Sequence, residues 1–145
     1  MEIGNSNAYG ALDEARLADF EADLGFTLPE DYRDFLLAHN GGTPVPSTFV
    51  SAREGEDRIE SLYGLHDGPD HLRLDEMWGI YRRRLPRGVL PVGDDPFGNA
   101  ICIALAGRHR GRIYFWDHER EPEDDPFEAL TALADGFTAF LASLR

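Results

Sequence analysis

The residue types best suited to chemistry gather in the second half of the chain. Side chains that commonly ligate divalent metal ions are Asp94, Asp95, His109, Asp117, His118 and Glu119. Adjacent side chains of a strand point to opposite faces, so Asp117 and His118 are poorly placed to chelate one ion. The chain has no HExxH motif, no paired Cys/His spacing and no EF-hand spacing. We therefore predict no metal site and keep a metal-assisted hydrolase only as an alternative.

Nucleophiles and phosphate-binding loops find no support in the sequence. The single cysteine, Cys102, lies in an apolar run over residues 100–104, which favours a buried inert thiol over a nucleophile. The chain contains neither GxSxG nor GxxxxGK[ST], and it has no lysine. Acids are so numerous that no particular pair is singled out for general acid–base catalysis. No catalytic residue is assigned from these patterns.

The overall charge disfavours several classes of partner. The chain has 27 acidic and 14 basic side chains, the latter all arginine, and a formal net charge of -13. Such acidity disfavours nucleic acid and anionic membranes as partners, whereas it would speed the approach of a basic protein. Arginines gather at residues 82–84 and 87 and again at 108, 110 and 112. We interpret the first group as solvated charge that complements the end of a helix rather than as a binding patch.

Length and hydropathy indicate one domain. The 145 residues are enough to bury a core without a disulfide, and a single cysteine cannot form one within the chain. No apolar run is long enough to span a membrane, and the first ten residues do not resemble a signal peptide. We expect a cytoplasmic protein with a flexible N-terminus over residues 1–12 and one domain over residues 13–145.

The elements that must position any site are organised around residues 28–42, LPEDYRDFLLAHNGG. Pro29 suits the first position of a helix, and the aromatic and apolar residues from Tyr32 to His39 recur at helical spacing. Asn40-Gly41-Gly42 favours a stop, because these residues tolerate the left-handed conformation of helix ends. We interpret this segment as a core helix with both ends encoded.

The remaining pattern predicts an α+β fold. Further helices are expected over residues 13–24 and 69–83, from Asp125 through Leu133, and over the apolar stripe from Phe137 to Leu144. Strands are expected over residues 44–51, 59–65, 88–92, 100–105 and 112–118, with a polar turn at 53–58. Helices and strands come in blocks, which indicates a mostly antiparallel or mixed β-sheet with an N-terminal helix pair and a C-terminal helix packed on it.

An ordered set of motifs resembles the SUKH superfamily, which includes fungal cell-wall-assembly regulators of the Smi/Knr type and bacterial immunity proteins. The matching segments run from residue 13 to residue 144 and match loosely over 44–84. They are Leu24-Gly25, Leu28-Pro29, Tyr32, Phe35-Leu36, Asn40-Gly41-Gly42, residues 91–94, Gly98-Asn99, residues 113–118, residues 133–137 with Phe137, and Phe140-Leu141.

The resemblance implies an α+β fold, no enzymatic activity and no cofactor. It implies a bacterial immunity protein that binds and neutralises a cognate protein toxin of a polymorphic or contact-dependent system, with a nuclease domain as the expected toxin. A general protein-interaction or regulatory module without a toxin remains an alternative. The family motifs, Leu28, Pro29, Tyr32, Phe35, Asn40, Gly41, Gly42, Gly98, Asn99 and Phe137, are expected to be structural.

Physical reasoning adds a candidate partner surface. A nuclease has a basic substrate cleft, which an acidic protein can cover with loops that carry carboxylates. The acids outside helices that best fit this role are Asp94, Asp95, Asp117 and Glu119, and Trp116 or Trp78 could serve as the aromatic anchor.

Overall fold

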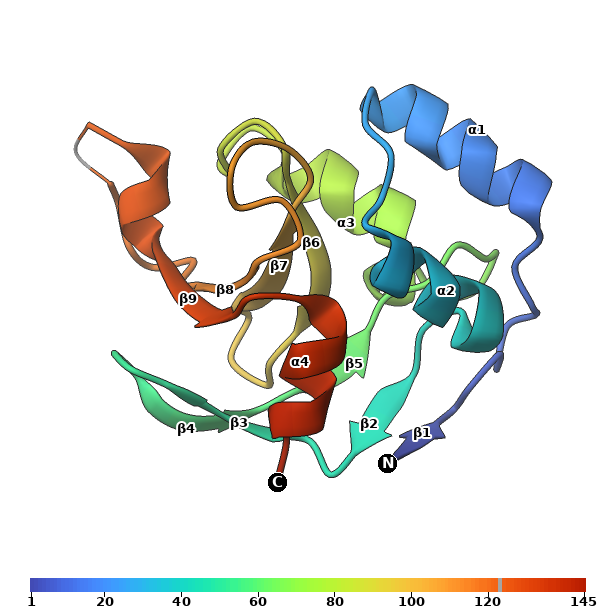
Figure 1. Cartoon of the computed structure of the whole chain (residues 1–145), viewed down its shortest axis with the longest axis horizontal. Coiled ribbons are helices and arrows are strands. Elements are labelled where there is room, and N and C mark those ends of the chain that lie inside the picture. The colour runs from blue at the N-terminus through green and yellow to red at the C-terminus, as the bar shows by residue number, and fades with distance from the viewer. Residues whose placement is uncertain (123) are drawn as a thin grey trace.

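The computed structural model describes residues 1–122 and 124–145 (Figure 1). Within these residues the structure has four α-helices: α1 (Glu14–Leu24), α2 (Glu30–His39), α3 (Leu74–Tyr81) and α4 (Phe137–Ser143). Two short 3₁₀ turns are η1 (Asp70–Leu72) and η2 (Pro126–Ala129). The strands are β1 (Glu2–Gly4), β2 (Thr43–Val45), β3 (Thr48–Ser51), β4 (Gly55–Arg58), β5 (Ser61–Leu62), β6 (Val89–Asp94), β7 (Ala100–Ala104), β8 (Ile113–Trp116) and β9 (Leu130–Ala134).

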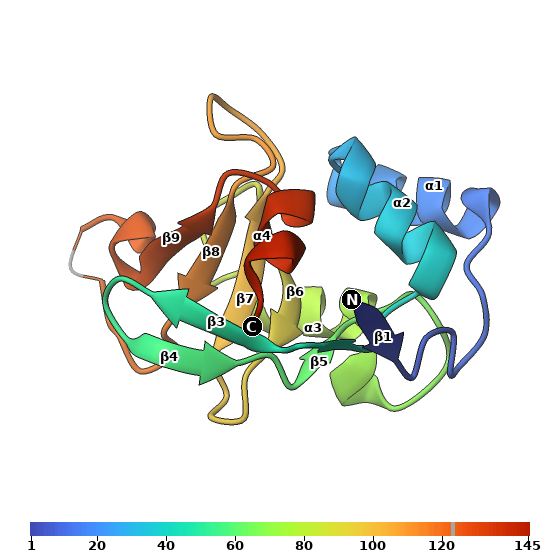
Figure 2. The ribbon, with the colours of Figure 1, turned by 60° about the horizontal axis from the view of Figure 1, so that its bottom comes forward.

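The centre of the fold is an antiparallel five-stranded sheet in the order β5-β6-β7-β8-β9. Two antiparallel strand pairs, β1-β2 and β3-β4, lie outside it. Helices α1 and α2 form a pair at one end of the molecule, and α4 lies across the sheet (Figures 1 and 2). This confirms the predicted α+β class, with an N-terminal helix pair and a C-terminal helix.

Strand β7 is buried on both faces, as its continuous apolar sequence predicts. Ile101 and Ile103 belong to the main core, which also takes the apolar residues of all four helices. Cys102 points to the other face, where a second cluster contains Tyr114 and Trp116 of β8. The strands are antiparallel, yet both faces of β7 are buried, because helices cover one face of the sheet and the α3–β6 connection helps to cover the other.

The two N-terminal helices end where their sequences predict. Asp13 caps α1 by accepting a hydrogen bond from the Arg16 N–H at 2.8 Å, and Gly25 ends it in the left-handed conformation with φ 79°. Asn40 ends α2 with φ 47° and ψ 50°. Pro29 lies one position earlier than predicted, at the N-cap of α2 instead of its first turn, so its extended φ and ψ direct the chain into the helix.

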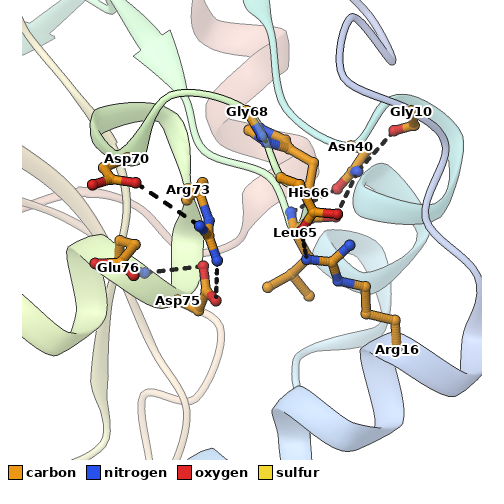
Figure 3. Close-up of polar contacts among 11 residues, drawn as sticks. Gly10, Arg16, Asn40, Leu65, His66, Gly68, Asp70, Arg73, Asp75 and Glu76 are labelled. Atoms are coloured by element: carbon orange, nitrogen blue, oxygen red, sulfur yellow. Dashed lines mark hydrogen bonds and ion pairs between the residues drawn. The ribbon is translucent and has the colours of Figure 1, made fainter.

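Asn40 joins three segments that are distant in sequence (Figure 3). Its side chain is buried and donates to the carbonyls of Gly10 and Leu65, each at 2.9 Å, while its Oδ1 accepts from the Leu65 N–H at 2.8 Å. A neutral buried amide with both its donors and its acceptor used is a stable arrangement. The amide therefore ties the end of α2 to the N-terminal segment and to the chain that follows β5.

Glycines make the close packing around Asn40 possible. Gly41 and Gly42 have φ values of 97° and 117°, which other residues rarely adopt. A Cβ atom at Gly42 would lie 2.5 Å from the Gly4 carbonyl oxygen, and one at Gly64 would overlap the Asn40 carbonyl group. The motif at residues 40–42 thus lies where strand β1 and the β5 segment cross the end of α2.

In three segments the structure has a strand where the sequence prediction has none. Residues 2–4, predicted to lack an element, pair with β2 through the register Ile3↔Pro44. The predicted polar turn at 53–58 contains β4, which pairs with β3 by backbone hydrogen bonds that do not need an apolar sequence. The helix predicted from Asp125 stops after η2, because Leu130–Ala134 joins the edge of the sheet beside β8.

Substitution of Gly64 tests the close approach at Asn40. We expect Gly64→Ala to lower the free energy of unfolding by about 3 kcal/mol or more, because the new methyl group overlaps backbone atoms that cannot rotate away. Gly79→Ala in α3 is the matched control. A Cβ at Gly79 meets nothing within 4 Å, so we expect a gain of about 0.5–1 kcal/mol from helix propensity. Urea unfolding measures both changes, and an unchanged midpoint for Gly64→Ala would contradict the geometry.

Candidate functional site

Asp95 lies inside the turn between β6 and β7 and is only 4% exposed. Its Oδ1 accepts hydrogen bonds from the Phe97 N–H at 2.9 Å and the Asn99 N–H at 2.8 Å, and its Oδ2 accepts from Asn99 Nδ2 at 2.9 Å. A carboxylate that accepts three such bonds holds the turn in shape. The exposure that a partner contact requires is therefore absent at Asp95.

Asn99 connects this turn to the end of β8. Its Oδ1 accepts from the His118 N–H at 3.2 Å and lies 2.6 Å from His118 Nδ1. Gly98, with φ 87°, brings the turn close to the imidazole, since a Cβ there would lie 3.3 Å from His118 Cε1. Asp95, Asn99 and His118 thus form one hydrogen-bonded series that fixes the start of the following acidic loop.

Trp116 is 2% exposed and packs within the second apolar cluster. The Tyr81 ring meets it edge-on at 5.0 Å between centroids, and the Arg84 guanidinium lies 4.8 Å from its ring. Arg84 also donates to the His118 carbonyl oxygen. The expectation of an accessible aromatic anchor is wrong for Trp116, because strand β8 is buried on both faces.

The other three predicted acids remain accessible to different degrees. The Glu119 side chain is 83% exposed, and Asp117 and Asp94 are half-buried. Asp117 Oδ1 accepts from the Glu119 N–H at 3.0 Å, and the Asp117 carbonyl accepts from the Arg120 N–H, so these residues form a tight turn. Of the predicted partner surface, the structure leaves Glu119, Asp117 and Asp94 able to meet another molecule.

One acid that the sequence prediction missed lies beside Asp95. Burial, and then the hydrogen bond and charge of Asp95, raise the pKa of Asp57 to about 7. Burial also raises the pKa of Asp94 to about 7, and the charges of Glu60 and Asp95 act in the same direction. Asp57 lies on β4, which the sequence pattern had placed in a turn, so no periodic signal related it to the acids after β6.

The predicted structural residues of α2 meet α4. Tyr32 and Phe35 each lie 5.0 Å from the Phe137 ring, measured between centroids, and Leu28 is buried beside Pro29. The Cys102 thiol is fully buried, which raises its pKa and leaves it inert. Across residues 1–122 and 124–145, no group of three His, Cys, Asp or Glu side chains is arranged to hold a metal ion, and no helix is long and apolar enough to cross a membrane.

A second polar cluster lies between α1, α2 and α3 (Figure 3). The His66 ring is buried beside Asn40, lies 4.8 Å from the Tyr9 ring between centroids at a tilt of 37°, and accepts from the Gly68 N–H at 3.0 Å through Nδ1. Burial lowers the pKa of His66, and the charge of Arg16 acts in the same direction. These contacts support the Asn40 junction and leave His66 inside the protein.

A hollow of about 300 Å³ lies between the α1–α2 connection, α3 and β6. Sequence reasoning did not find it, because its walls come from three separated segments. The Arg82 guanidinium lies 4.3 Å from the Trp78 ring, and the Arg87 guanidinium lies 5.9 Å from the Phe26 ring. Arg82 and Arg87, from the group interpreted from sequence as solvated charge, therefore border a depression with partly apolar walls.

Comparison with known proteins assigns this chain to a family. The model of the SMI1 / KNR4 family (SUKH-1) matches residues 11–143. The chain belongs to this family. A curated relative from Bacillus subtilis (strain 168), named as the SPbeta prophage-derived uncharacterized protein YokK, is 30% identical over 148 aligned positions, which cover 89% of this chain and 72% of that protein. The SUKH resemblance predicted from the motifs is thus confirmed.

The raised pKa of Asp57 gives this SUKH-1 protein a testable pH dependence. The folded state binds the Asp57 proton more tightly than the unfolded state does, so this group lowers stability as pH rises from about 4 to about 7. We expect Asp57→Asn to raise the free energy of unfolding by about 1 kcal/mol at pH 8, where solvent screens part of the interaction, and to have little effect near pH 4.

Thermal unfolding at the two pH values measures this difference. Glu56→Gln is the matched control, because Glu56 lies on the same strand with its side chain 69% exposed. A gain for Asp57→Asn that is equal at both pH values would contradict the assigned cause.

Proposed function

We propose that this chain is a non-enzymatic bacterial immunity protein that binds and neutralises a cognate protein toxin, with a nuclease domain as the toxin. The observation that carries the proposal is the SUKH-1 family match over nearly the whole chain. The similarity to a prophage-derived bacterial protein supports a bacterial setting over a fungal regulatory one. Neutralisation would come from covering the toxin's substrate site, which requires affinity and shape but no reaction.

Charge supports a basic partner surface. The net charge of -13 gives long-range attraction to a basic cleft and speeds encounter with it. Contact itself needs exposed carboxylates on a backbone of fixed geometry, because mobile groups lose entropy on binding. Glu119 meets this requirement best, with the half-buried Asp117 beside it, since both lie in a turn that Asn99 holds at the His118 N–H.

Co-expression tests the proposal. Toxin domains encoded beside the gene are expressed one at a time in a host, with and without this chain, and growth is scored. We expect one toxin domain to arrest growth alone and to permit growth when this chain is present. A chain that is expressed and folded but rescues growth from none of the neighbouring toxin domains would contradict the proposal and favour an interaction module without a toxin.

The exposed acids predict a salt-dependent contact. We expect Asp117→Asn with Glu119→Gln to weaken toxin binding about 5- to 10-fold at low salt and to reduce the dependence of affinity on salt, because two carboxylates no longer face the basic cleft. Calorimetry at two salt concentrations measures both quantities. Each substitution keeps the shape of the side chain, and the amide oxygen introduced at position 117 can still accept a hydrogen bond from the backbone N–H of residue 119.

A variant of equal charge controls for long-range effects. Asp19→Asn with Glu2→Gln removes two exposed acids elsewhere on the surface, and we expect less than about a 2-fold change in affinity. Equal losses for the two double variants would place the toxin contact outside the Asp117–Glu119 turn.

A further inference from the structure

Apolar side chains form part of the walls of the hollow beside α3, and polar atoms make up the larger share of its exposed lining. It is bordered by the ends of α1 and α3, the start of β6 and the residue that follows β7. Its apolar walls are formed by Leu24, Phe26, Trp78, Leu85, Val89 and Leu105. Its volume of about 300 Å³ accommodates one or two large apolar side chains of another molecule, which is the kind of depression that anchors binding hot spots.

Two arginines, Arg82 and Arg87, line this depression. The Arg82 guanidinium lies 4.3 Å from the Trp78 ring centroid, and the Arg87 guanidinium lies 5.9 Å from the Phe26 ring centroid. Arg110 donates to the Thr27 carbonyl at 3.0 Å and to the Leu105 carbonyl at 3.2 Å, which fixes the α1–α2 connection against the end of β7. A guanidinium stacked on an aromatic ring keeps its N–H edges available to a carboxylate.

The positive charge of this rim is not neutralised within the described parts of the chain. Among the described residues, ion pairs form at other arginines, such as Arg33, Arg58 and Arg73. None of the ion pairs in that part of the chain joins an acid to Arg82, Arg87 or Arg110. Acids outnumber bases by 27 to 14 in this chain, so two arginines without an ion pair beside one hollow differ from the overall charge balance. The charge there is complementary to carboxylates.

We propose that this hollow binds an acidic segment of a partner protein, with one apolar side chain in the depression and flanking carboxylates on Arg82 and Arg87. A nucleic acid fits less well, because it would place no apolar side chain against Trp78 and Phe26. This contact goes beyond the proposed function, since it is opposite in sign to the Glu119 surface and holds whether or not the partner is a toxin.

The two tryptophans allow the site to be located in solution. Trp78 lines this hollow, whereas Trp116 lies under Arg84 in a neighbouring hollow that Arg83 and Arg120 also border. The probe is a synthetic eight-residue peptide with a central Leu-Phe pair between three acidic residues on each side, blocked at both ends. It is titrated into the isotopically labelled full chain, and the indole N–H signals are followed by NMR, with Trp78→Phe to assign them.

We expect the acidic peptide to shift the Trp78 indole signal saturably and to leave the Trp116 signal in place. Replacing Leu-Phe by Ser-Ser in the peptide should weaken binding about 10-fold, because the apolar anchor is lost. Arg82→Ala with Arg87→Ala should weaken binding by a similar factor of about 10. The matched control, Arg53→Ala with Arg145→Ala, removes two exposed arginines elsewhere and should change affinity less than about 2-fold.

Several results would overturn the proposal. One is a Trp78 signal that does not move, and another is a response confined to Trp116. Equal losses of peptide affinity in the two arginine double variants would show that the peptide is attracted by positive charge in general and is not bound at this hollow. A single-stranded oligonucleotide that shifts the Trp78 signal at lower concentration than the peptide would replace the occupant by nucleic acid. Growth rescue is measured separately with the Arg82→Ala, Arg87→Ala variant. This distinguishes a failure of the present proposal from a failure of the proposed function.

Discussion

The buried side chain of Asn40 is the constraint on which the arrangement of this protein depends. One amide satisfies the backbone of the segment after β5 at both its N–H and its carbonyl, and it also binds the carbonyl of Gly10. The left-handed turn at Asn40 and the absence of a side chain at Gly64 allow the approach. Through this junction the α1–α2 pair keeps a fixed position beside the sheet. There, the end of α1 and the connection to α2 form one wall of the hollow at Trp78.

The acidic side chains of this protein have different roles according to how deeply they are buried. Asp95 is used inside the molecule to shape a turn, and Asp57 and Asp94 are held near it with raised pKa values. Glu119 stands outside that group in solvent. Arg82 and Arg87, by contrast, lie near the Trp78 and Phe26 rings at the hollow beside α3. The two contacts proposed above are therefore opposite in sign, with carboxylates at Glu119 and arginines at Arg82 and Arg87.

Sequence reasoning succeeded where the deciding interaction is local. The ends of α1 and α2 depend on Asp13, Gly25 and Asn40, whose conformations and caps are set within a few residues. It failed where distant segments decide. Leu130–Ala134 has a helical pattern of apolar residues but forms a strand, because β8 offers an open edge. The hydrogen bonds to Asp95 are local, from Phe97 and Asn99, but its neighbour Asp57 comes from a distant strand. The hollow at Arg82 likewise depends on segments far apart in the sequence.

The stoichiometry of neutralisation tests the central claim, that this fold acts by binding and performs no reaction. The neighbouring toxin domain identified by growth rescue is purified, and its activity is measured while this chain is added in increasing molar ratio. We predict that toxin activity falls linearly and reaches zero near one molar equivalent. Loss of all activity with a small fraction of one equivalent would show that the chain acts catalytically, and activity that persists at several equivalents would show that it does not neutralise the toxin.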